Sequence, residues 1–275
     1  MTGLATSTVM GLPGLELQFV VGLLLQYFFC SLRIGAFLLS APLFGARWMP
    51  LPVRIMMALV LGSIVAVQFP SITISQLTTA QTVMAVFNEL AIGLTAGLIL
   101  SILFAAILLA GEKIASTAGL GFAAQVDPQT GGQTPVVSQT LYLFLLVLFL
   151  SLDGHLIALA TIYKSYELIP IGSVIKPEAM VQAGIDAGGA MFLAAAIIML
   201  PIAIILLLIN VSIGIITKSA PQLNLFSFGF PISLLAVFFA LYISVGSLGN
   251  SMRWLIDDSL ETVEMMIVEV GNGGR

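Results

Sequence analysis

Charged side chains inside long apolar stretches are the residues of this sequence best suited to carry chemistry. A charge within a membrane-length apolar segment is costly and normally faces a partner or water. Two functions fit such residues: a proton or ion relay, as in a secondary transporter, and ion pairs that fix the register of helices or subunits. Arginine stays protonated and is a poor relay, which favours the structural interpretation. The residues concerned are Arg33, Glu89, Glu112, Lys113, Asp153 and Asp186.

Four of these residues, Arg33, Glu89, Glu112 and Lys113, are predicted to take part in charge pairing. Glu112 and Lys113 are adjacent at the end of an apolar run, where pairing or snorkelling satisfies them. The alternative is a transporter of a small solute, in which Glu89, Asp153 and Asp186 would be the coupling groups. Such transporters are expected to show paired broken helices in two related halves. The sequence shows no convincing internal repeat.

Catalytic and metal-binding equipment is sparse. Cys30 is the only cysteine and His155 the only histidine, so an intramolecular disulfide and a Cys/His metal site are excluded. One histidine, one cysteine and no clustered acid pair leave little for an enzyme to use. The net charge of −4 comes without a clustered basic face, which gives no reason to expect nucleic-acid binding. We predict a protein that is not an enzyme and has no cofactor.

The composition predicts an all-α, polytopic membrane protein. The chain is 59% hydrophobic and 8% charged, whereas soluble domains are about 25% charged. A bilayer core needs about 20 apolar helical residues, which gives about six long apolar helices with kinks. The apolar runs cover residues 17–43, 55–69, 90–109, 136–152, 187–217 and 230–248. The basic residues between the first two runs lean toward the cytoplasmic side by the positive-inside rule.

Some runs depart from plain lipid-facing helices. Residues 187–217 are charge-free and would form about 46 Å of helix at about 1.5 Å per residue. Because a bilayer core is about 30 Å thick, this helix must tilt, bend at Pro201 or project beyond the bilayer. Glycines four residues apart let helices approach closely. Two such pairs are present, Gly93 with Gly97 and Gly184 with Gly188.

Residues 111–135 are too long and too apolar for a plain connection between two apolar helices. Small residues, one aromatic residue and an Asp-Pro turn signal indicate a compact element that can dock inward as a pore plug or gate. An ordinary surface loop is the alternative. Glycine gives the segment backbone freedom. The residues predicted to form the plug are Gly119, Gly121, Phe122, Asp127 and Pro128.

Residues 218–231 connect the last two apolar runs and are unusually apolar for a turn, which indicates a surface for a protein partner. The predicted subunit-docking residues are Pro221, Leu223, Asn224, Leu225, Phe226, Gly229 and Pro231. After the last run, acidic and apolar residues alternate at helical spacing and predict an acidic amphipathic end helix. Its acidic face holds Asp257, Asp258, Glu261 and Glu264, and its apolar face holds Leu260, Val263 and Ile267.

Three motifs in order carry a resemblance that covers nearly the whole chain. They are RIGAFLLSAPLFGARWMPLPVRIMMAL from Arg33, GLGFAAQVDP from Gly119 and APQLNLFSFGFP from Ala220. The chain resembles the FliR family, the R component of the flagellar type III protein export gate, with homologues in virulence secretion injectisomes. The second motif is similar to the plug region of that family, and the third to its late loop.

The resemblance implies a subunit of a helical, hetero-oligomeric channel for unfolded flagellar proteins. The P and Q components would be its neighbours, the B component would contact the gate at its cytoplasmic side, and the site would be the flagellar basal body in the bacterial inner membrane. Residues 1–186 would be P-component-like and include the plug segment. Residues 187–275 would be a Q-component-like hairpin with the acidic end helix. In this family much of the gate is raised out of the bilayer plane, so apolar runs would also face sister subunits.

Overall fold

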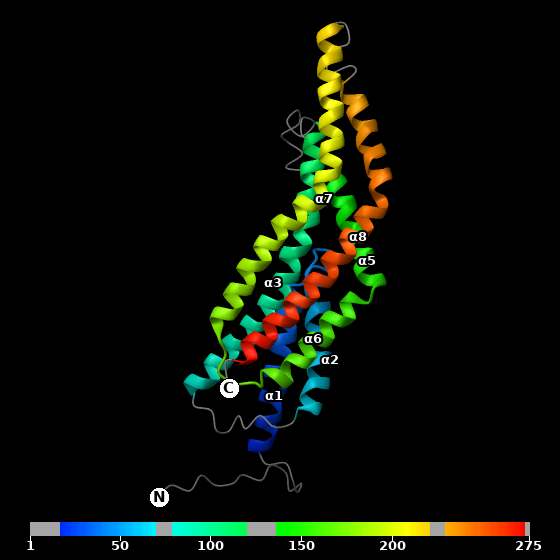
Figure 1. Ribbon diagram of the computed structural model, residues 1–275. Helices are drawn as coiled ribbons and strands as arrows, with labels where there is room; N and C mark the ends of the chain where they lie inside the picture. Colours follow the sequence, from blue (N-terminus) through cyan, green and yellow to red (C-terminus); the bar gives the residue numbers. More distant parts are fainter. Residues whose placement is uncertain (1–16, 70–78, 120–135, 221–228, 273–275) are drawn as a thin grey trace, which may run out of the picture. The chain divides into compact units, whose positions relative to one another are not determined.

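The computed structural model describes residues 17–69, 79–119, 136–220 and 229–272, and contains no strand in these ranges (Figure 1). The helices are α1 (Leu17–Ser40), α2 (Leu51–Gln68), α3 (Thr79–Thr117), α5 (Val136–Ser151), α6 (Gly154–Leu168), α7 (Pro177–Ser219) and α8 (Phe230–Gly271). Five are long and apolar enough to cross a membrane, and up to six spans result if the broken pair of α5 and α6 counts as one. The prediction of an all-α, polytopic membrane protein is confirmed.

Three helices are much longer than the apolar runs that predicted them. Helices α3, α7 and α8 contain 39, 43 and 42 residues. At about 1.5 Å per residue each is roughly 60 Å long, about twice a bilayer core. Polar and charged residues marked the ends of the predicted runs, but such residues do not by themselves end a helix; glutamate and lysine, for example, are good helix formers, and the backbone of α3 continues past Glu112 and Lys113. Pro201 lies inside α7, which runs through it.

The chain divides into two compact units that interleave along the sequence. Unit 1 consists of the described residues of Met1–Leu100, Ile157–Gly184 and Val263–Arg275. Unit 2 consists of those of Ser101–Leu156 and Ile185–Thr262. Helices α3, α6, α7 and α8 each contribute residues to both units. The predicted division at residues 186 and 187 concerns likeness to partner components, which is a different property, and it stays a prediction.

Within unit 1, α1 and α2 pack closely as an antiparallel pair. A Cβ added at Gly62 would lie 3.0 Å from the Cα of Ser31, so only a residue without a side chain allows this approach. About one turn further along α2, Gln26 Nε2 donates to the carbonyls of Ala66 and Phe69 at 2.8 and 2.7 Å. These carbonyls belong to the end of α2, where intrahelical partners are missing. A side chain of α1 therefore caps α2.

Helix α3 approaches α1 through the first predicted glycine pair. A Cβ added at Gly93 would lie 2.8 Å from the Cβ of Ala36, and one at Gly97 would lie 2.8 Å from the backbone nitrogen of Ala41. The second pair differs. A Cβ added at Gly184 or Gly188 would meet nothing within 4 Å in the described part of the chain, apart from its own helix. Within unit 1 the first pair therefore sets a close helix crossing.

Within unit 2, a close helix approach and the hydrogen bonds of one asparagine join the helices. A Cβ added at Gly111 of α3 would lie 2.8 Å from the Cβ of Ser138 of α5. On α7, Asn210 Nδ2 donates to the carbonyl of Thr117 at 2.9 Å, and Asn210 Oδ1 accepts from the hydroxyl of Ser233 at 3.3 Å. One amide thus links three helices, α3, α7 and α8, and its buried polar atoms are satisfied in doing so.

A break separates α5 from α6, where the predicted run 136–152 ends. Asp153 has φ 55°, in the left-handed region that ends a helix. A Cβ added at Gly154 would lie 2.5 Å from the Cε2 of Phe149. The turn therefore needs a glycine at 154, because any side chain there would strike the phenylalanine ring.

Candidate functional site

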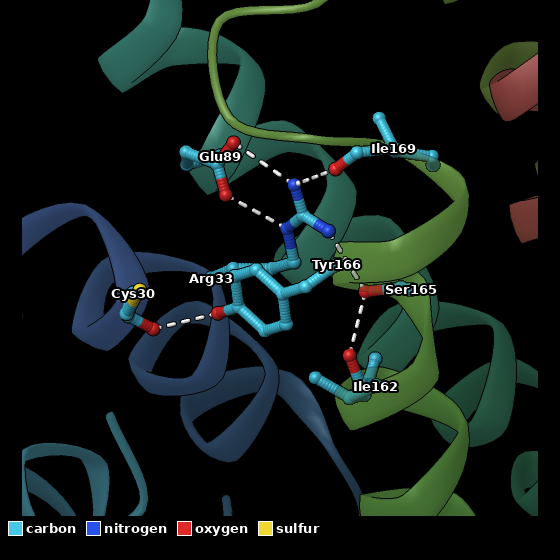
Figure 2. A network of polar contacts seen from close by, with 7 residues as sticks. All are labelled: Cys30, Arg33, Glu89, Ile162, Ser165, Tyr166 and Ile169. Atoms are coloured by element: carbon cyan, nitrogen blue, oxygen red, sulfur yellow. Dashed lines mark hydrogen bonds and ion pairs between the residues drawn. The ribbon is translucent and has the colours of Figure 1, made fainter. Parts of the chain in front are cut away.

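A buried ion pair joins α1 to α3 inside unit 1. The side chains of Arg33 and Glu89 are 0% and 2% exposed (Figure 2). Arg33 Nε donates to Glu89 Oε2 at 2.7 Å, and Arg33 Nη2 donates to Glu89 Oε1 at 2.9 Å. Two parallel N–H···O contacts of this kind form the bidentate geometry that makes an arginine–carboxylate pair strong and directional.

Helix α6 supplies two further acceptors to the same guanidinium group. Arg33 Nη1 donates to Ser165 Oγ, and Arg33 Nη2 donates to the carbonyl of Ile169, both at 2.9 Å. Ser165 in turn donates to the carbonyl of Ile162 at 2.6 Å. Ile169 follows the last residue of α6 and precedes Pro170, so its carbonyl has no helical donor. A cation at a helix C-terminus is also favoured by the helix dipole.

Tyr166 of α6 contacts both the guanidinium group of Arg33 and the backbone of α1. The centroid of its ring lies 4.2 Å from Arg33 Cζ, a cation–π distance. Its hydroxyl donates to the carbonyl of Cys30 at 2.6 Å. Figure 2 shows the network as one cluster in which side chains from α1, α3 and α6 converge on the guanidinium group.

The chemistry of this cluster suits it to hold α1, α3 and α6 together. Arginine remains protonated under all ordinary conditions, so Arg33 passes no proton. Both oxygens of Glu89 accept from Arg33. A buried pair adds little net stability compared with well-packed apolar residues, but a buried charge that loses its partner is strongly destabilising. The cluster therefore penalises any arrangement of α1, α3 and α6 other than the one that brings these groups together.

Comparison of the sequence with known proteins assigns the chain to a family. The family described as "Bacterial export proteins, family 1" matches residues 24–259, which include every residue of the cluster. The chain belongs to this family. The resemblance to the FliR family is confirmed by curated relatives over most of the chain.

Several of these relatives carry the name "Flagellar biosynthetic protein FliR". The protein from Pectobacterium carotovorum subsp. carotovorum is 35% identical over 76% of this chain and 80% of its own. The one from Escherichia coli (strain K12) is 31% identical over 76% and 79%. The one from Bacillus subtilis (strain 168) is 29% identical over 92% and 98%. The similarity thus spans both compact units.

The other intramembrane charges of this bacterial export protein lie elsewhere. Glu112 and Lys113 are exposed on α3 in unit 2, and the structure does not bring them to the pair of Arg33 and Glu89. Asp153 is exposed in the turn after α5, and Asp186 is exposed on α7. No group of three or more histidine, cysteine, aspartate or glutamate side chains that could hold a metal ion is found among the described residues.

Most residues predicted for the plug and the docking loop fall outside the described part of this family member. Of the plug residues, Gly119 is described. It follows α3 with φ 81° and its N–H donates to the carbonyl of Ser116 at 3.0 Å. Gly229 directly precedes α8, and Pro231 is the second residue of that helix. Outside the described residues lie Gly121, Phe122, Asp127, Pro128, Pro221, Leu223, Asn224, Leu225 and Phe226.

Three members of the cluster were missed in the sequence of this export protein: Ser165, Tyr166 and Ile169. They lie more than 130 residues from Arg33, with separations of 132 for Ser165 and 136 for Ile169. The available signal was the mixed polar segment TIYKSYEL followed by Ile169 and Pro170. It marks a helix end with free carbonyls, which is a natural acceptor for a buried cation.

Proposed function

We propose that the chain is a subunit of the flagellar type III export gate in the bacterial inner membrane, at the basal body. It forms part of the wall of a channel for unfolded flagellar proteins, together with the P and Q components, and the B component contacts it at the cytoplasmic side. It is not an enzyme. The observation that carries this proposal is the family match over residues 24–259, together with relatives named as flagellar biosynthetic proteins.

The apolar surface of unit 2 supports a subunit role. Large apolar side chains are exposed along α7 and α8, for example Phe192, Leu208, Phe238 and Tyr242, which is 77% exposed. Exposed apolar area on this scale needs lipid or protein cover. Because α7 and α8 are each longer than a bilayer core is thick, lipid cannot cover their whole length. Sister subunits are the natural cover for the rest.

Affinity purification of the full chain from flagellated cells tests the assignment. A gate subunit brings the P and Q components with it in a fixed ratio, whereas a solitary transporter is recovered alone and exchanges a solute. The transporter alternative has little structural support, since both carboxylate oxygens of Glu89 accept from Arg33.

The plug is part of the same proposal. Residues 111–117 of the predicted segment belong to α3, so the plug consists of the residues between 118 and 135, which fold inward and close the channel until an unfolded substrate displaces them. Gly119, where α3 has ended, has the positive φ that lets the chain leave the helix direction. Any larger residue would be strained at this point.

Deleting residues 118–124 is expected to make membranes leaky to small solutes while the gate still assembles. The reason is that the obstruction is shortened, while the deletion begins only after Thr117, the last residue of α3. Solute efflux from cells producing the variant, at matched levels of assembled complex, measures the effect. Deleting seven residues from the connection between α2 and α3 is the control and is expected to leave the membrane tight. An assembled deletion variant as tight as wild type would exclude the plug.

Replacing Leu223, Leu225 and Phe226 by serine is expected to reduce recovery of neighbouring gate subunits severalfold. These residues form the proposed docking surface on the cytoplasmic side, and apolar anchors dominate the energy of most interfaces. Quantitative mass spectrometry of the affinity-purified chain gives the ratio of subunits. Serine at the three exposed positions Val21, Leu23 and Leu24 of α1 is the matched control for lost apolar area. Unchanged recovery of the subunits would count against the loop as a docking surface.

A further inference from the structure

An open groove of about 280 Å³ lies in unit 1 between α1 and α2, with Leu90 of α3 at its wall. Its floor consists of small residues, Gly35 and Ala58, whose side chains leave space between the helices. Leucine and isoleucine side chains form the sides, and Leu39 and Ile55 are about half exposed. Ser31 and Arg54 are the polar residues of a lining that is otherwise apolar and suits a hydrocarbon chain.

Arg54 lies in the lining of the same groove, close to the start of α2. Its Nη2 donates to the carbonyls of Ala46 and Met49, which are neutral groups. Its Nε is one of two side-chain polar atoms in the described part of the chain that are buried and have no hydrogen-bond partner. A buried donor without an acceptor is costly. Arg54 thus places a positive charge, with one unsatisfied N–H, in the wall of a groove that is mainly apolar.

The start of α2 adds a second positive feature at this end of the groove. The N-cap residue is Pro50, which makes no side-chain cap, and no acidic residue lies in the first turn. The N–H groups of Val53 and Arg54 donate to the carbonyl of Pro50, and Pro52 has no N–H, so it is the helix dipole at the N-terminus of α2 that favours an anion. The side chain of Arg54 and the N-terminus of α2 therefore both favour an anion at this end of the groove.

The turn before α2 has the composition of a membrane–water interface. It joins the two membrane-length helices α1 and α2 and carries Arg47 and Trp48, both exposed. Tryptophan and basic residues gather where lipid headgroups meet the hydrocarbon. The positive-inside rule predicts this turn on the cytoplasmic side, where anionic lipids are enriched.

We infer that the groove between α1 and α2 binds one anionic phospholipid. The phosphate pairs with the guanidinium group of Arg54 beside the N-terminus of α2, and an acyl chain lies along Gly35 and Ala58. A partner helix about 10 Å wide is too broad for a groove of this volume and would leave the charge of Arg54 unanswered. A free anion would leave the apolar groove empty. An anionic lipid supplies both a negative charge for Arg54 and a hydrocarbon chain for the apolar groove.

Fluorescence quenching of Trp48 by brominated lipids tests this inference on the full chain with Trp254→Phe, which leaves one tryptophan. The chain is reconstituted into vesicles of brominated phosphatidylglycerol or brominated phosphatidylcholine, mixed with the unbrominated lipid. We expect a relative binding constant about fivefold higher for phosphatidylglycerol, since one basic residue near an anionic surface contributes on the order of a factor of five. Equal quenching by the two lipids would overturn the inference.

Variants separate the site from general surface charge. Arg54→Gln is expected to abolish the preference for phosphatidylglycerol, so that the two lipids bind about equally. Arg54→Lys is expected to keep most of the preference. Arg47→Gln, in the same turn, is expected to retain the preference, and a loss as large as that of Arg54→Gln would overturn the inference. Gly35→Leu fills the groove without changing charge and should also remove the preference. Gly22→Leu on the same helix, where an added Cβ meets nothing within 4 Å, should not.

A protein occupant is the remaining rival, and it gives a distinct result. If the complex purified with the other gate components loses the quenching that the isolated chain shows, a protein covers the groove and the lipid inference fails. Lipid selectivity retained in the complex supports it. Melting temperatures of all variants, measured in the same micelles, must match the parent for the comparison to count.

Discussion

Replacing Glu89 by alanine is expected to destabilise the chain by about 3–5 kcal/mol, the cost of leaving a buried charge without its partner. Arg33 is fully buried and cannot lose its charge, and the carboxylate accounts for two of its four hydrogen bonds. A loss of this size is a large share of the roughly 5–15 kcal/mol that holds a typical domain together. Denaturant titration of the purified chain in micelles, followed by tryptophan fluorescence, gives the free energy of unfolding.

Glu112→Ala is the matched control, because it removes an exposed glutamate from the same helix. It is expected to change the free energy of unfolding by no more than about 0.5 kcal/mol. The double variant Arg33→Met with Glu89→Leu removes both charges and should be more stable than Glu89→Ala alone. Additive effects of Arg33→Met and Glu89→Leu, with no coupling between them, would contradict the assigned pair.

Gly93→Ala is expected to destabilise the chain by about 1–3 kcal/mol, the usual cost of forcing extra volume into a packed core. The added methyl group would strike the carbonyl oxygen of Arg33 and the Cβ of Ala36, and backbone atoms cannot turn aside as a flexible side chain can. The same substitution pushes α3 away from α1 and so lengthens the contact between Arg33 and Glu89. Both the free energy of unfolding and swimming on soft agar should fall.

Gly22→Ala supplies the comparison for that prediction. Gly22 lies on α1, and a Cβ there would meet nothing within 4 Å. Alanine is better than glycine in a helix by about 1 kcal/mol, so this variant should be neutral or slightly stabilised. If the two glycine variants behaved alike, the close crossing of α1 and α3 would be wrong.

The helices were predictable from the sequence because membrane-length apolar runs leave few alternatives. Their ends were not. The run 90–109 stopped before Glu112 and Lys113, yet α3 continues to Thr117. A charge marks where hydrocarbon becomes unfavourable, whereas a helix ends where its backbone hydrogen bonds end, and these are different points. For the same reason the acidic residues 257–264, expected in a separate end helix, belong to α8.

Arg33 and Glu89 could be singled out in the sequence, since a charge in an apolar run is rare. Their pairing with each other could not be derived, because residues 56 positions apart meet only through tertiary structure. Ser165 and Tyr166 gave weaker signals still, because serine and tyrosine are common in helices and only the fold gives them a buried cation to face. The groove at Arg54 escaped notice because Arg54 looked like an ordinary basic residue in a connection.

The positions of the cluster residues along the chain also determine how long Arg33 waits for its partners during translation. Glu89 follows Arg33 by 56 residues and Ile169 follows it by 136. At about 5–20 residues per second of translation, the acid emerges roughly 3–11 s after the arginine and the last acceptor roughly 7–27 s after it. An arginine at the centre of a lone membrane helix costs about 2.5–3.5 kcal/mol to insert. Throughout those seconds the insertion machinery, and not the fold, has to shelter the charge on α1.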